Sequence, residues 1–273
     1  LLGRLHLPDQ LDHARHGAHG IGLLGEGIGG ADDMGGGRLL GRAVQHGLPL
    51  LELRQHRLED VLAAIAVEVD LEIGDAAVRN AVDGIISGQQ QAGVTDARNT
   101  IAHLQIVRPE AVKRISENHI IPVVAPLWVP YDPEYSQHEI DYLGQERFDN
   151  EYRIKDFFDL GCPVNFHSDY PVSPDIDMPL TIYCAVTRTD LVHGAAGVHG
   201  IGQAVTRQQA LEAMTFNVAY QLKEENRLGM LKPGMVANLS IYDVDFLKDP
   251  IEKVPNANVV ATYVDGNIVY PKR

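Results

Sequence analysis

From residue 67 onward, short apolar runs alternate with segments of helical periodicity, and this alternation most constrains the fold. Pro109 suits the first turn of a helix and Gly161 suits a helix end. Strands that alternate with helices predict an α/β fold with a parallel sheet. Strands are predicted at residues 67–73, 100–107, 120–129 and 162–166, helices at residues 76–87, 109–118, 151–160, 178–189 and 206–222, and an acidic, tyrosine-rich loop at residues 130–145.

The last part of the chain has a different pattern. Asp265 and Gly266 separate two apolar runs, and Asp-Gly in that position favours a hairpin with a two-residue turn. A small β module at residues 226–273 is therefore expected after the α/β unit of residues 67–225. Its strands are predicted at residues 237–243, 259–264 and 267–270.

Residues 1–66 do not resemble the rest of the chain. Ten glycines lie within residues 17–37, and no Phe, Tyr or Trp precedes Trp128. Such a segment cannot easily offset its ordering entropy, so we expect a flexible arm or the product of a misassigned reading frame. Helical periodicity returns at residues 57–68. The glycines of residues 20–25 match GxGxxG, but no strand precedes them and no helix follows, which indicates a chance match.

The composition restricts the classes of partner. The 273 residues include 37 acidic and 23 basic side chains, for a net charge of −14. An acidic surface disfavours nucleic acid and anionic membranes as partners. No apolar run approaches the roughly 20 residues of a membrane span. With only Cys162 and Cys184, no disulfide framework is expected and a reducing, cytoplasmic location is favoured.

Two predicted strands end in residues that suit metal chemistry. His103 lies late in the strand at residues 100–107, and Asp169 directly follows the strand at residues 162–166. In a barrel, the carboxyl ends of the strands meet on one open face. A His and an Asp there can bind a divalent metal, and the Asp can accept a proton from water. Spacing alone favours the alternative of a buried histidine on a backbone carbonyl and an aspartate that caps a turn.

Further candidates lie beside these two residues. His167 is two residues before Asp169, so it points the same way from an extended strand. We expect it to orient Asp169, and direct ligation is the less favoured interpretation. Aromatic residues near the predicted strand ends either line an apolar substrate pocket or pack loops onto the barrel mouth. They are Trp128, Tyr131, Tyr135 and Tyr170.

Eight short stretches after residue 67 form an ordered set of motifs. They are residues 74–79, 98–109, 126–128, 167–172, 185–188, 211–217, 229–234 and 264–266. Together they make residues 67–273 resemble the amidohydrolase superfamily, in the branch of long metal-dependent amidohydrolases that includes formamide-deformylase-like proteins. Residues 1–66 have no counterpart in this resemblance.

The resemblance implies a distorted, TIM-like (β/α)₈ barrel beside a β-sandwich formed from both chain ends. It also implies hydrolysis of a C–N bond, other than a peptide bond, by metal-activated water, with zinc as the expected metal. The histidine that matches His103 ligates metal on the sixth strand. The aspartate that matches Asp169 ends the eighth strand, binds metal and acts as the general acid–base. This chain would contribute the C-terminal strands of the barrel.

The sequence departs from the family pattern at other ligand positions. The His-x-His pair of the first strand has no match in residues 1–66, and Leu71 occupies the ligand position of the fifth strand. Asp70 and Glu72 could offer carboxylates instead, although a local deletion or a charged sheet edge is favoured. A catalytic zinc site usually has three protein ligands.

These departures lead to two expectations for the function of the chain. The first is a truncated, weakly active or inactive hydrolase of a small amide-type substrate. The alternative is a non-catalytic remnant that forms a homo-oligomer, or an interaction subunit, through its open sheet edge.

Overall fold

The computed structural model of the chain describes residues 69–72, 74–173 and 176–271. Every described residue belongs to one unit of the chain, which begins at residue 62. The predicted helix at residues 57–68 and the glycine-rich segment lie outside the described residues.

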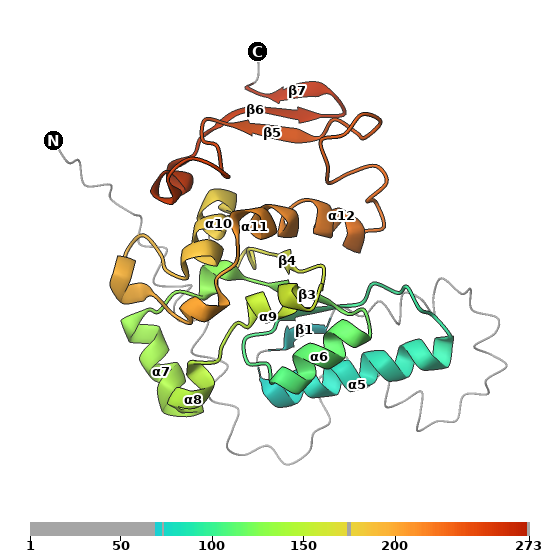
Figure 1. Cartoon of the computed structure of the whole chain (residues 1–273), viewed down its shortest axis with the longest axis vertical. Coiled ribbons are helices and arrows are strands. Elements are labelled where there is room, and N and C mark those ends of the chain that lie inside the picture. Colours follow the sequence, from blue (N-terminus) through green and yellow to red (C-terminus); the bar gives the residue numbers. More distant parts are fainter. Residues whose placement is uncertain (1–68, 73, 174–175, 272–273) are drawn as a thin grey trace. The chain divides into compact units, whose positions relative to one another are not determined.

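Four parallel strands form one sheet, in the order in which they occur along the chain (Figure 1). This sheet confirms the predicted parallel α/β arrangement. The strands are shorter than predicted because the chain leaves the sheet after His103 and after Val124. They are β1 (Val69–Glu72), β2 (Thr100–His103), β3 (Ile121–Val124) and β4 (Asn165–Phe166).

Helices follow the strands and pack against them and against each other. Helix α5 contacts β1, α6 contacts α5 and β3, and α11 contacts β4. The α-helices are α5 (Asp75–Ala92), α6 (Pro109–Glu117), α7 (Pro133–Leu143), α8 (Gln145–Phe148), α9 (Ile154–Asp159), α10 (Met178–Thr187), α11 (Arg207–Ala213) and α12 (Phe216–Gln221). Short 3₁₀ helices are η1 (Pro126–Trp128), η2 (Gly194–Gly197), η3 (Ile201–Gln203) and η4 (Ile251–Asn256).

Two predicted elements are wrong. The predicted loop at residues 130–145 contains helix α7, because the Asp132 side chain accepts hydrogen bonds from the backbone N–H groups of Glu134 and Tyr135 at 2.9 and 3.0 Å. The single helix predicted at residues 206–222 is two helices, α11 and α12, because Thr215 between them adopts a non-helical backbone conformation.

Strand β2 lies in the middle of the hydrophobic core. All four of its residues are buried, and it is flanked by β1 and β3. Ile101 on this strand and Phe157 on α9 have no exposed surface, and Phe166 at the end of β4 belongs to the same cluster. Each side chain of this size contributes roughly 1.5–3 kcal/mol when it is fully buried. The core therefore fixes the strand that ends in His103.

A second, antiparallel sheet follows near the end of the chain (Figure 1). Asp265 and Gly266 form its hairpin turn with φ of 50° and 75°, which confirms the hairpin predicted from Asp-Gly. The described residues of this module form a single sheet, so a β-sandwich and the division at residue 226 stay predictions. The strands are β5 (Leu239–Tyr242), β6 (Val259–Val264) and β7 (Asn267–Tyr270).

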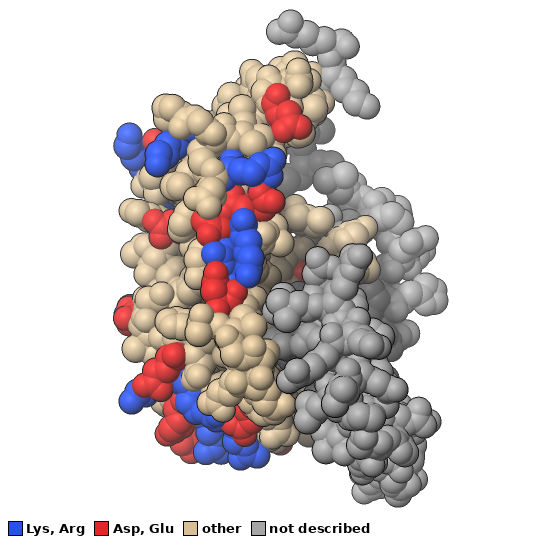
Figure 2. Space-filling view, turned by 90° about the vertical axis from the view of Figure 1, so that its right-hand side faces the viewer, with Lys and Arg blue, Asp and Glu red and all other residues tan. Residues whose placement is uncertain are grey.

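The described surface carries charges of both signs. In Figure 2, acidic and basic side chains are interspersed over the visible described residues. Within the described ranges, no helix combines the length and the apolar character that crossing a membrane requires.

Candidate functional site

His103 and Asp169 face each other at the carboxyl ends of two strands. His103 is the last residue of β2, and Asp169 follows β4. The Nε2 atom of His103 lies 4.0 Å from Oδ1 of Asp169. The His103 side chain is 5% exposed and the Asp169 side chain 21%, so a small molecule can reach the carboxylate more easily than the imidazole.

Both residues have backbone conformations that side chains other than glycine rarely adopt. The φ angle is 64° at His103 and 59° at Asp169, which is the left-handed region. This conformation costs about 1–2 kcal/mol for an ordinary residue. Strained residues of this kind cluster at functional sites, where the surrounding structure holds them in place. The two strand ends therefore share an uncommon backbone conformation, one that aspartate and histidine adopt more readily than most residues.

The contacts of a purely structural pair are missing from the described residues. The turn after β4 uses Ser168, whose Oγ accepts a hydrogen bond from the Tyr170 backbone N–H at 3.2 Å, and not the Asp169 carboxylate. Within the described ranges, the Nδ1 atom of His103 is buried without a hydrogen-bond partner. Nε2 of His103 and Oδ1 of Asp169, at 4.0 Å, are too far apart for a hydrogen bond and so retain capacity for a further ligand. The catalytic and metal-binding roles of the two side chains stay predictions.

Two aromatic rings lie against the imidazole of His103. The His167 ring is edge-on at 5.0 Å between centroids, and the Trp128 ring is tilted at 5.4 Å. The His167 backbone N–H donates to the carbonyl of Val124 at 3.0 Å, which continues the pairing of β3 and β4. This position suits either role predicted for His167, that of a metal ligand or that of a residue that orients Asp169.

Trp128 also connects His103 to the turn that contains Asp169. Its indole N–H donates to Oγ of Ser173 at 3.0 Å. The Asp169 carbonyl accepts the backbone N–H groups of Val172 and Ser173 at 2.8 and 3.1 Å. Tyr170, by contrast, is 62% exposed. The substrate-lining roles predicted for Trp128 and Tyr170 stay predictions.

We expect the Trp128–Ser173 hydrogen bond to stabilise this turn. Trp128→Phe keeps an aromatic ring but removes the donor, and Ser173→Ala removes the acceptor. Each change should lower the free energy of unfolding by about 1 kcal/mol for the lost bond. The double variant should lose less than the sum of the two, by roughly 0.5–1.5 kcal/mol. Urea titration of the four proteins measures this coupling, and strictly additive losses would contradict it.

The pair fits two ligand positions of a metal site. Zinc binds histidine nitrogen and carboxylate oxygen, and both atoms are directed at one another here. Within the described ranges, no three His, Cys, Asp or Glu side chains gather closely enough to hold a metal. Strand β1 carries Asp70, Leu71 and Glu72, whose side chains lie outside the described part of the structure.

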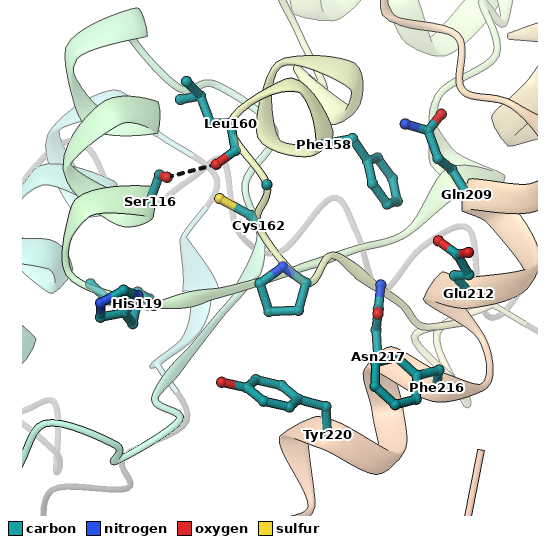
Figure 3. A pocket seen from close by; sticks show the side chains of 13 residues that line it. Ser116, His119, Phe158, Leu160, Cys162, Gln209, Glu212, Phe216, Asn217 and Tyr220 are labelled. Carbon is teal, nitrogen blue, oxygen red and sulfur yellow. Dashed lines mark hydrogen bonds between the residues drawn. The ribbon is translucent and has the colours of Figure 1, made fainter. Parts of the chain in front are cut away.

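A cavity of about 680 Å³ lies at the other end of the strands (Figure 3). Its walls include His119 and Ile120, which precede β3, and Cys162 and Pro163, which precede β4. Barrel enzymes carry out their chemistry at the carboxyl ends of the strands. Because the cavity is lined by neither His103 nor Asp169, it has no part in the candidate site.

A buried polar cluster beside His103 was not predicted from the sequence. The Gln105 amide donates to Oε1 of Glu139 at 2.5 Å and to Oε1 of Glu151 at 3.0 Å. Burial and the nearby Glu139 carboxylate raise the pKa of Glu151 to about 8. Burial, assisted by the charge of Arg188, lowers the pKa of His199 to about 4. No local sequence signal indicates this cluster, because its members lie far apart along the chain.

Comparisons with known proteins agree with this fold. Residues 38–270 match the sequence profile of the Amidohydrolase family. Over 200 residues the chain is 30% identical to Protein LONG AFTER FAR-RED 3 of Arabidopsis thaliana, a match that covers 73% of this chain and 33% of that protein. The structure is similar to that of an uncharacterized metal-dependent hydrolase from Pyrococcus horikoshii OT3, with a TM-score of 0.54, 26% identity, and coverage of 66% of this chain and 34% of the other.

Consecutive parallel strands, each followed by a helix, are the repeating unit of the barrel-type α/β fold. The chain belongs to the amidohydrolase family, since the profile matches most of its length. The family match begins at residue 38, earlier than the resemblance found at residues 67–273. The chain spans about one third of the length of the relatives that it matches.

Proposed function

We propose that the chain contributes to metal-dependent hydrolysis of a C–N bond, other than a peptide bond, in a small amide-type substrate. The observation that carries this proposal is the facing pair of His103 and Asp169 at two strand ends, 4.0 Å apart and on strained backbone. Membership of the amidohydrolase family and the similarity to a metal-dependent hydrolase support the reaction class.

In this proposal each side chain of the site has a defined role. Nε2 of His103 and Oδ1 of Asp169 would be two of the metal ligands, and the Asp169 carboxylate would accept the proton of the attacking water. A bound divalent metal supplies Lewis acidity and activates water for attack. The His167 and Trp128 rings restrict the orientation of the His103 imidazole. Trp128 and the exposed Tyr170 are the proposed contacts for the substrate.

Zinc is the proposed metal, because imidazole and carboxylate are among its usual ligands. The resemblance to formamide-deformylase-like proteins makes N-formyl compounds the first substrates to assay, followed by other N-acyl amines. Weak or absent turnover, homo-oligomerisation and a cytoplasmic location stay predictions. Measurements of turnover and of light scattering test the predictions of weak turnover and of homo-oligomerisation.

The decisive experiment measures zinc affinity and turnover for the purified chain and for two variants. Asp169→Asn and His103→Asn both suit the site, because asparagine tolerates the left-handed backbone of these positions. Asp169→Asn should lower kcat/KM by about 10²-fold or more, as expected for loss of a general base. Both variants should bind zinc more weakly than the parent chain in competition with a chelator.

Two control variants match these changes in residue type and backbone. His119 and Asp265 are exposed and also have left-handed φ angles, 54° and 50°. His119→Asn and Asp265→Asn should therefore leave zinc affinity and turnover unchanged. A parent chain that neither binds zinc nor turns over any substrate would overturn the proposal. A stable oligomer by light scattering would then favour the non-catalytic remnant.

A further inference from the structure

The end of β2 makes a strained turn directly at the candidate site. His103 and the next residue, Leu104, both have left-handed φ angles, of 64° and 52°. The Leu104 N–H donates to the carbonyl of Ala102 at 2.9 Å, which tightens the turn. Two consecutive strained residues persist only where the surrounding structure over-determines their conformation. Contacts immediately beyond the turn therefore help to hold the backbone from which the His103 imidazole projects.

Gln105, the first residue after this turn, is anchored through both its backbone and its side chain. It is 5% exposed, and its carbonyl accepts the Tyr152 N–H at 2.8 Å. The two hydrogens of its amide group go to separate carboxyl groups, those of Glu139 at 2.5 Å and Glu151 at 3.0 Å. These contacts connect the turn to helix α7 and to the segment before α9, far away in sequence.

The anchor lies in a buried polar environment. The Glu151 side chain is 1% exposed, and its Oε2 lies 3.8 Å from Nε2 of His199. The buried Arg188 guanidinium donates to the backbone carbonyl of Glu151 at 3.4 Å. Burial raises the pKa of Glu139 as well as that of Glu151. With a proton on Glu151, the amide joins two carboxyl groups without placing two negative charges side by side.

We propose that Gln105 is a positioning residue: by joining the Glu139 and Glu151 carboxyl groups with one amide, it fixes the turn that directs His103 toward Asp169. The inference rests on the proposed metal site, because partners that orient a metal ligand affect metal affinity by about 10- to 100-fold. It also predicts that Gln105 positions the His103 imidazole in the metal-free chain.

The test uses the full chain labelled for NMR, without metal and then with zinc. Gln105→Met preserves the size of the side chain and removes the amide, and Gln105→Asn keeps an amide that is too short to reach both carboxyl groups. Both should shift the ring signals of His103 in the metal-free chain and weaken zinc binding by about 10- to 100-fold. Glu151→Gln retains an acceptor for the Gln105 amide and should keep the parent signals.

Gln137→Met is the matched control, since Gln137 is exposed on helix α7, the helix that also carries Glu139. It should change neither the His103 signals nor zinc affinity. Parent-like His103 signals in both folded Gln105 variants would overturn the inference, even if their stability falls. If Gln105→Met does not fold, Gln105→Asn decides the matter. A parent chain that binds no zinc would sink the proposed function, and the metal-free signals would still decide the role of Gln105.

Discussion

Replacing Arg188 by methionine should lower the free energy of unfolding by about 3–5 kcal/mol. Arg188 has no exposed surface, and among the described residues its guanidinium donates only to backbone carbonyls. These are the carbonyls of His199 at 2.8 Å, Tyr152 at 3.2 Å and Glu151 at 3.4 Å. Methionine would fill much of the volume but leave the carbonyls of His199 and Glu151 without a donor, each at a cost of roughly 1–3 kcal/mol, whereas the Tyr152 carbonyl keeps the Ile154 N–H at 2.7 Å.

Removing the buried positive charge of Arg188 offsets only part of the lost free energy of unfolding. Burial lowers the pKa of Arg188 to about 10, so the guanidinium is still charged at neutral pH. Residue 200 leaves space for this side chain because it is a glycine, Gly200, with φ of 58°. A Cβ atom at this position would lie 2.8 Å from a guanidinium nitrogen of Arg188. A site with room reserved for the guanidinium should tolerate its loss poorly.

Urea denaturation of three variants tests this expectation. Arg188→Lys keeps the charge but cannot reach all three carbonyls, so it should recover little of the lost stability. Arg79→Met on the exposed face of α5 is the control, and it should change the free energy of unfolding by less than about 0.5 kcal/mol. An Arg188→Met variant as stable as the parent would show that burying the charge costs as much as its hydrogen bonds contribute.

The elements that could be predicted from the sequence are those with local signals. The Asp265-Gly266 pair predicted the hairpin, and the predicted strand bounds agree with those of β6 and β7. Pro109 likewise predicted the start of α6. Helix α7 also has a local signal, Asp132 followed by Pro133, but its acidic and tyrosine-rich composition hides any apolar stripe. The break between α11 and α12 at Thr215 has neither glycine nor proline to indicate it.

The candidate site was predictable only in part for the same reason. His103 and Asp169 each follow an apolar run, and parallel strands bring their ends together, so their proximity could be expected from the pattern. The cluster around Gln105 could not be expected from the sequence pattern. Glu139 and Glu151 are 34 and 46 residues from Gln105, and a Glu in a polar stretch is normally exposed. Only the tertiary fold reveals that the Glu151 side chain is buried and that the Glu139 side chain is partly buried.

Between pH 6.5 and pH 8, the free energy of unfolding should fall by about 1–1.5 kcal/mol. The pKa of Glu151 is about 8 in the folded chain, above its usual value of 4.5, because burial and the Glu139 charge disfavour the carboxylate. The folded state therefore holds a proton that the unfolded state has already released. Stability from this group is complete below pH 4.5 and is lost as the pH rises toward 8. Burial raises the pKa of Glu139 too, which acts in the same direction.

His199 has the opposite dependence. Its pKa is about 4 in the folded chain against a usual 6.5, because burial and the Arg188 charge disfavour the imidazolium. Its contribution is present above pH 6.5 and is lost as the pH falls toward 4. Between pH 4.5 and 6.5 the two dependences oppose each other and nearly cancel. The net loss of stability is therefore concentrated on the alkaline side, between pH 6.5 and 8.

Glu151→Gln separates the two groups. This variant keeps an acceptor for the Gln105 amide but cannot titrate, so its stability should be level between pH 6.5 and 8. Below pH 6.5 it should lose about 2–3 kcal/mol by pH 4.5, because the His199 dependence is no longer opposed. Glu146→Gln, at an exposed position in α8, should reproduce the parent curve. Urea titrations from pH 4.5 to 8.5 measure these curves. Equal parent stability at pH 6.5 and 8.5 would show that Glu151 carries no proton in the folded chain.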